Sequence, residues 1–74
     1  MMTEILRTVF DLTPQEARVA ALIGAGDNPA AIASAMDISI HTARTHVARI
    51  HAKTDTSDLL GLASRINALV PPVA

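Results

Sequence analysis

The chain has 74 residues and no cysteine, so it is long enough for one small domain and supplies neither a disulfide nor a thiolate metal site. Its formal net charge is −1, and no apolar run approaches the roughly 18 residues that cross a bilayer. Half of the residues are apolar but only one is aromatic, which suits small helices and argues against a surface that stacks single-stranded bases. The first residues lack the pattern of a secretory signal, so we expect a cytoplasmic protein without a membrane segment.

Residues 1–11 are expected to form an N-terminal arm or a short helix. The apolar residues that indicate one short extra helical turn after Thr3 are Ile5, Leu6, Val9 and Phe10. A domain is expected over residues 12–70, because signals for helix starts recur along this segment.

The first of these signals is Thr-Pro-Gln-Glu at residues 13–16, which has the pattern of a capping box. It predicts a helix from Pro14 to about Ala25. Gly24 and Gly26 offer left-handed positions at which this helix can end.

A second, shorter helix is predicted from Pro29 to about Met36, with Asn28 as its N-cap. A turn of three residues follows, and Ser39 is a good N-cap for a third helix that ends near Thr54. Two helices joined by so short a turn, the second one cationic, are typical of a helix-turn-helix.

After a break at residues 55–57, Thr56 or Ser57 is expected to cap a last helix that ends near Leu69. Its inward stripe is predicted to contain Leu59, Leu62, Ala63 and Ile66. Pro71 and Pro72 then end helical structure, and residues 71–74 form a tail.

Residues 39–54, SIHTARTHVARIHAKT, hold all three histidines and three of the six Lys and Arg residues, without an acid. A metal site is one interpretation of this composition. His41, His46 and His51 are spaced by five residues, so successive rings differ by about 140° around a helix and cannot share a face. We therefore expect no metal and no cofactor.

The apolar residues of the same segment do share a face, which predicts a helix packed on a core. The predicted inward stripe is Ile40, Ala43, Val47, Ile50 and Thr54. The outward face has small or polar residues with cations around them, and such a face can enter the DNA major groove. From this position Arg44 can reach a guanine edge, and Arg49 and Lys53 can reach phosphates.

The sequence resembles the LuxR/GerE-type helix-turn-helix domain of bacterial transcription regulators. The family opening L-T-x-x-E is present at residues 12–16, LTPQE, and the second family signature is matched by residues 32–53, IASAMDISIHTARTHVARIHAK. The resemblance spans about residues 12–69. It implies an all-α, four-helix helix-turn-helix bundle that binds double-stranded DNA and regulates transcription. The sequence shows no catalytic constellation, so we do not expect an enzyme.

The resemblance also implies roles for individual residues. The base-contacting residues are Arg44, Thr45 and Ala48, to which we add His41 from the same outward face. The phosphate-contacting residues are Thr42, His46, Arg49 and Lys53, although Thr42 and His46 can also be residues at the edge of the core. The final helix is expected to form a homodimer through Leu60, Gly61, Ser64 and Ala68, or else to be simply exposed.

The alternative function is a protein-interaction module of the same fold that binds a related regulator instead of DNA. The low net charge favours this alternative. So do Ala30 and Ala31, which stand where the family often has Lys and Glu.

Overall fold

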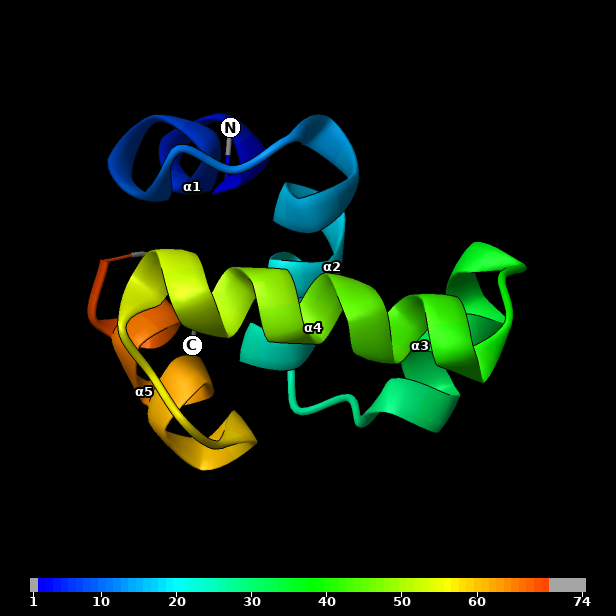
Figure 1. Ribbon diagram of the computed structural model, residues 1–74. Coiled ribbons are helices and arrows are strands. Elements are labelled where there is room, and N and C mark those ends of the chain that lie inside the picture. The colour runs from blue at the N-terminus through cyan, green and yellow to red at the C-terminus, as the bar shows by residue number, and fades with distance from the viewer. Residues whose placement is uncertain (1, 70–74) are drawn as a thin grey trace.

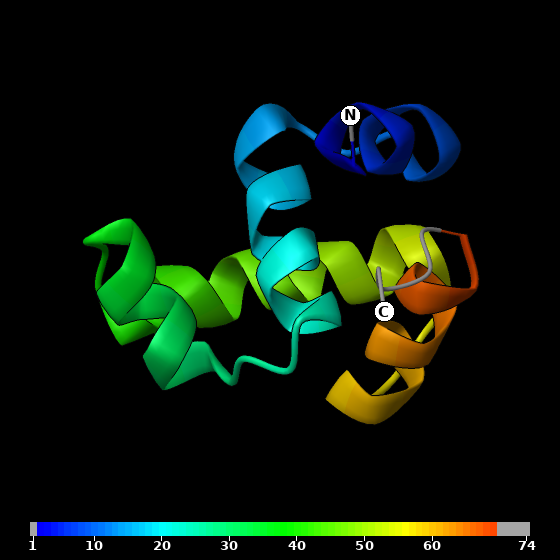
Figure 2. The ribbon, with the colours of Figure 1, turned by 180° about the vertical axis from the view of Figure 1, so that it is seen from behind.

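The computed structural model describes residues 2–69, and within them the chain forms five α-helices and no strand. They are α1 (Met2–Phe10), α2 (Pro14–Gly24), α3 (Pro29–Met36), α4 (Ile40–Thr54) and α5 (Leu59–Leu69) (Figure 1). The longest helix, α4, crosses α2, and α3 and α5 lie near opposite ends of α4 in both views (Figure 2). The helices α3 and α4 with their short turn are the predicted helix-turn-helix, and the all-α fold is confirmed.

Three of the helices begin at the residues that the sequence predicted. Thr13 and Glu16 form the capping box of α2, with N···O distances of 3.2 and 3.0 Å. The Asn28 side chain accepts a hydrogen bond from the Ala31 amide, and Ser39 Oγ accepts one from the Thr42 amide. Each cap satisfies an amide that has no partner within its own helix.

The predicted cap of α5 was wrong. The residue at its N-terminus is Asp58, whose Oδ1 accepts a hydrogen bond from the Gly61 amide at 2.6 Å. Aspartate is as good an N-cap as serine, and its negative charge suits the positive end of the helix dipole. The hydroxyl of Thr56 is instead bonded to side chains at the end of α4.

The ends of the helices depend on left-handed residues, three of which are aspartates. Asp11, Asp37 and Asp55 follow α1, α3 and α4 with φ values of 56°, 54° and 56°. Gly26, with φ of 102°, ends α2 as predicted. Gly24 is not left-handed but the last residue of α2, where a Cβ would lie 2.9 Å from Ile66 Cγ2 of α5.

The first helix, α1, is longer than the single turn predicted for it. It is nine residues long, and it packs on α2 with Leu6 fully buried. Burial against α2 stabilises more turns than the short apolar pattern indicated, because packing contributes more to a short helix than its own propensity does.

The hydrophobic core lies where α2 meets the other helices. It consists of Leu6, Leu12, Ala17, Val19, Ala20, Ile23, Ile32, Ala33, Ala43, Val47, Ile50, Leu62 and Ile66. The inward stripe of α4 is confirmed except for Ile40, which is 43% exposed because it is the first residue of that helix, beside the turn.

No helix in the described part of the chain has the length and apolar character needed to span a membrane. The predicted effect of Pro71 and Pro72 and the predicted tail at 71–74 lie outside the described residues.

Candidate nucleic-acid interface

The exposed face of α4 has a small-residue centre with an arginine on each side. At about 100° per residue, Ala48, Ala52 and Thr45 fall within roughly 60° around the helix axis, with Arg44 beyond one edge and Arg49 beyond the other. Both arginines and both alanines are exposed, and Thr45 is half-buried. His41 is also exposed, one turn before Thr45. From Thr45 to Ala52, beyond the imidazole of His41 in the first turn, nothing bulky stands on the centre of this face.

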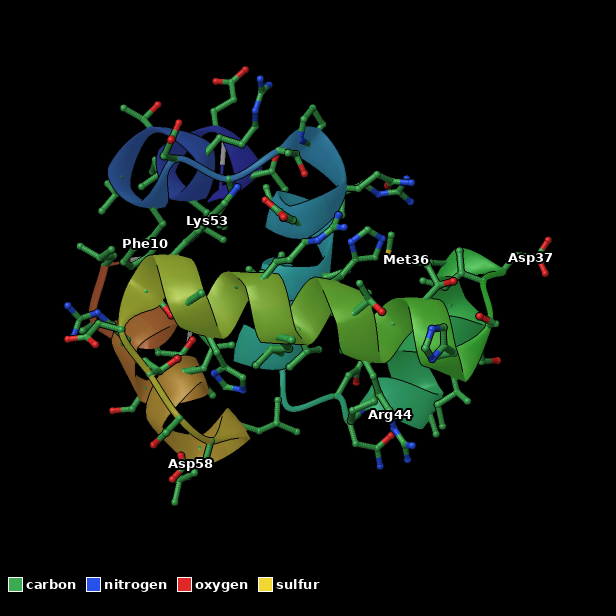
Figure 3. All side chains as sticks on the ribbon, in the orientation of Figure 1. Phe10, Met36, Asp37, Arg44, Lys53 and Asp58 are labelled. Carbon is green, nitrogen blue, oxygen red and sulfur yellow. The ribbon has the colours of Figure 1, made fainter. Side chains whose placement is uncertain are left out.

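The two arginines of this face are free of partners within residues 2–69. No hydrogen bond or ion pair in that range involves the side chain of Arg44 or Arg49. Figure 3 shows Arg44 extending from the N-terminal half of α4. Both guanidinium groups can thus donate all their hydrogen bonds to a ligand.

The hydroxyl of Thr42 keeps a hydrogen for an outside acceptor. Ser39 Oγ lies 2.9 Å from Thr42 Oγ1 and donates to it, while it accepts from the Thr42 amide at 3.0 Å. Because Thr42 Oγ1 accepts this bond, its own hydrogen is not used by Ser39. Neither Thr42 nor Ser39 is tightly buried.

The imidazole of His46 is half-buried at the edge of α4. Its Nδ1 is buried and has no hydrogen-bond partner among the described residues. A hydrogen on Nδ1 would be a buried donor without an acceptor, so Nε2 is the ring nitrogen that suits a donor. His46 can therefore donate a hydrogen bond to a ligand through Nε2.

Lys53 differs from the two arginines because its ammonium group is bonded inside the protein. Its Nζ lies 2.6 Å from Glu16 Oε1 and donates to the Asp11 carbonyl oxygen at 3.1 Å. Figure 3 shows Lys53 reaching from α4 toward α1. One side chain thus joins the last turn of α4 to the start of α2 and to the turn between α1 and α2.

Glu16 is buried, and it bonds to Lys53 as well as to the Thr13 amide. Burial raises the pKa of the Glu16 carboxyl, but the Lys53 ammonium and the Thr13 amide outweigh burial and hold this pKa below its ordinary value. The carboxylate therefore stays ionised in the folded protein.

A chain of hydroxyl groups closes the C-terminal end of α4. His51 Nδ1 lies 2.7 Å from Thr56 Oγ1, which lies 2.9 Å from Thr54 Oγ1, and Thr54 donates to the Ile50 carbonyl at 2.8 Å. Because the Thr54 hydroxyl donates its only hydrogen to the Ile50 carbonyl, the Thr56 hydroxyl must donate to Thr54 Oγ1. The Thr56 hydrogen is then used, so His51 donates to Thr56 Oγ1 from Nδ1. Among the described residues no group of three His, Asp or Glu side chains can hold a metal ion.

The outer face of α5 is exposed. Leu60 is 82% exposed, while Leu62 and Ile66 on the other face are fully buried. The remaining residues expected at a dimer interface, Gly61, Ser64 and Ala68, are also exposed. Leu69, which the sequence analysis did not single out, adds a second exposed leucine on this helix.

A family model described as bacterial regulatory proteins, luxR family, matches residues 11–66, a segment that contains α2, α3, α4 and most of α5. The chain belongs to the LuxR family of bacterial regulatory proteins. Comparisons with curated proteins and with solved structures gave no match. Membership confirms the resemblance seen in the sequence, and it supports a role in DNA binding and transcription regulation. The LuxR family is a group of DNA-binding regulators and not a class of enzymes.

The sequence of this LuxR-family domain did not indicate the partners of two side chains in α4. The pattern of residues 13–16 indicated that Glu16 has a capping role, but Lys53 lies far from it in the sequence. The bond between His51 and Thr56 spans the end of the helix, which no periodicity describes. The one sequence signal for a nearby cation is the acid of the capping box, because such an acid needs an opposite charge if it is buried.

Proposed function

We propose that this LuxR-family domain binds duplex DNA sequence-specifically and regulates transcription in this way. Residues 39–54, which comprise α4 and its N-cap, lie in the major groove in this proposal. The observation that carries the proposal is the exposed face of α4, where two arginines without a partner in residues 2–69 border a centre of small side chains. A major groove about 12 Å wide accepts a helix only when its side chains permit close approach.

Within this proposal Arg44 contacts a guanine edge with two hydrogen bonds, and Thr45, Ala48 and His41 lie against neighbouring bases. Arg49, Thr42 and His46 contact phosphates, which fixes the position of the helix on the duplex. The hydroxyl hydrogen of Thr42, which has no acceptor among residues 2–69, supports its role, because a phosphate oxygen accepts hydrogen bonds and donates none.

Lys53 is a less suitable phosphate contact than the sequence indicated. Its ammonium group would have to leave or share the buried Glu16 carboxylate to reach DNA. We therefore assign Lys53 mainly to holding α4 in place, and we expect its loss to affect folding before it affects the salt dependence of binding.

The test is selection of duplex sites from a random library, followed by measurement of affinity with single variants. Arg44→Ala should weaken binding to the selected site by about 1–3 kcal/mol and relax the preference at one position. Arg7→Ala removes the same charge from the exposed surface of α1 and is the matched control, so it should change affinity little. Equal effects of the two variants would refute base contact by Arg44.

The homodimer is a second part of the proposal. One copy offers few phosphate contacts, so two copies on inverted half-sites are needed for useful affinity. Leu60 and its small neighbours on α5 supply an exposed surface with a large apolar side chain at one end.

Leu60→Glu should therefore lower self-association and DNA affinity together, while the helical content stays unchanged. Thr8→Glu, at an exposed position of α1, controls for added charge. Sedimentation equilibrium measures the oligomeric state, and an unchanged state in Leu60→Glu would remove α5 as the interface.

A protein-interaction module that binds a related regulator is the second candidate. The exposure of Leu60 favours it, as do the exposed Ala30 and Ala31 at the start of α3, where a phosphate contact would otherwise be expected. Failure of the wild-type domain to enrich any duplex sequence, together with capture of a purified LuxR-family regulator, would establish this candidate over DNA binding.

A further inference from the structure

We propose that the centre of the exposed α4 face recognises the 5-methyl groups of thymine bases, and that Thr45 takes part through its methyl group and not through its hydroxyl. This inference rests on the proposed function, since it names the feature of the bases that α4 contacts in the major groove. It turns a general preference for DNA into a prediction about base composition at the centre of each half-site.

The hydroxyl of Thr45 already donates a hydrogen bond within its own helix. Its Oγ1 donates to the carbonyl oxygen of His41 at 3.0 Å. A threonine hydroxyl has one hydrogen, so this bond uses its only donor. The same bond selects one of the two side-chain rotamers that threonine adopts in helices. Thr45 therefore offers DNA a methyl group and oxygen lone pairs, and it cannot donate to the acceptor atoms of guanine or adenine.

Two further methyl groups continue the surface that Thr45 begins. Ala48 and Ala52 are exposed, and they lie within roughly 60° of Thr45 around the helix axis. The stretch from Thr45 to Ala52 is about 10 Å long, which is close to three base-pair steps. An apolar strip thus runs along the middle of the face, between the two arginines.

Thymine is the base that such a strip fits. In the major groove only thymine displays an apolar group, its 5-methyl, whereas the other bases display hydrogen-bonding groups. The competing contact is an amino group of adenine or cytosine donating to Thr45 Oγ1. Ala48 and Ala52 have no hydrogen-bonding side-chain group, so the strip as a whole favours the methyl contact.

The first experiment removes the methyl groups from the DNA. A duplex site selected by the wild-type protein is resynthesised with each dT replaced singly by dU, which lacks the methyl but keeps the pairing and the hydrogen-bonding groups. Affinity should fall about fourfold at one or more thymines, the value expected for one buried methyl-sized group. A site that binds equally well with every dT replaced would overturn the inference.

The second experiment removes the methyl from the protein. Thr45→Val keeps a methyl at the same place and loses the hydroxyl, whereas Thr45→Ser keeps the hydroxyl and loses the methyl. The valine variant should retain the dU effect, because it keeps the methyl group. The serine variant should bind about fourfold more weakly and lose the dU effect at one thymine. The reverse order of the two variants would show that the hydroxyl is the recognised group.

The two proposals fail in different ways. If the wild-type protein enriches no sequence from the library, sequence-specific binding is refuted and the thymine contact with it. If it enriches a site that tolerates dU throughout, the thymine contact alone is refuted. Circular dichroism of both Thr45 variants should match that of the wild type, because Thr45 is not part of the buried core.

Discussion

Arg44 and Lys53 lie on the same helix and carry the same charge, but their surroundings differ. Arg44 is exposed and has no hydrogen-bond partner within residues 2–69, whereas the Lys53 ammonium is bonded to Glu16 and to the Asp11 carbonyl. The last turn of α4 lies beside the turn between α1 and α2, whereas no other helix of the described part of the chain lies over the exposed face where Arg44 stands (Figure 3).

The difference shows that the number of cations on a helix overstates the number available to a ligand. Residues 39–54 contain three Lys and Arg residues, and their spacing alone does not separate them. What separates them is whether a buried acid from another helix reaches the same place. The cations of this helix that remain available to a ligand are therefore Arg44 and Arg49.

The strongest test of this difference is Lys53→Met, which keeps most of the side-chain stem and removes the charge. The buried Glu16 carboxylate would then lack its ionic partner, and we expect the free energy of unfolding to fall by about 2–4 kcal/mol. This is less than the loss for a fully buried pair, because Lys53 is 34% exposed. Urea denaturation followed by circular dichroism measures the change.

The matched control is Arg44→Met, whose effect on unfolding should stay within about 0.5 kcal/mol, as for other exposed positions. Adding Glu16→Gln to Lys53→Met should recover part of the loss, because the unpaired charge is then gone. If Lys53→Met and Arg44→Met both unfold at the wild-type urea midpoint, Lys53 contributes no more to stability than Arg44 does.

A smaller effect should appear in the pH dependence of stability. The pKa of Glu16 is lowered in the folded protein from its ordinary value of 4.5, so the ionised carboxylate stabilises the fold. This contribution is fully present above pH 4.5 and is lost as the pH falls through the lower folded value. The difference in unfolding free energy between wild type and Glu16→Gln should thus shrink in acid. A constant difference from pH 7 to pH 3 would contradict the assignment.

The smallest effect tests the end of α4 without changing a cation. Asp55 is left-handed, with φ of 56°, and its negative charge lies at the negative end of the helix dipole. Asp55→Gly should therefore raise the free energy of unfolding by about 1 kcal/mol and leave DNA affinity unchanged. Destabilisation by Asp55→Gly would mean that the Asp55 side chain makes a contact of its own.

Asp58→Ala, which removes the cap of α5, should lower the free energy of unfolding by about 1 kcal/mol.

Much of the fold follows from local sequence signals. The caps at Thr13, Asn28 and Ser39 act over three residues, so the sequence alone determines where α2, α3 and α4 begin. The inward stripe of α4 follows from helical periodicity in the same way. Ile40 departs from it because periodicity gives a direction around the helix but not the distance from the core.

The parts that could not be predicted depend on contacts between distant segments. The length of α1 depends on α2, and the state of Lys53 depends on Glu16. For the candidate site, the outward direction of Arg44 and Arg49 could be predicted from the spacing. The hydrogen-bond directions at Thr42 and Thr45 could not, because they depend on rotamers that only the folded helix selects.

The bond between Lys53 and Glu16 also leads to a prediction about local opening of the native protein. The last turn of α4 and the turn between α1 and α2 cannot separate without leaving the buried carboxylate unpaired. We therefore expect these two segments to open as one cooperative unit, although they lie at distant points of the sequence. The amide of Leu12, bonded to the Arg7 carbonyl, and the amide of Thr56, bonded to the His51 carbonyl, should then exchange their hydrogens with solvent at the same opening free energy.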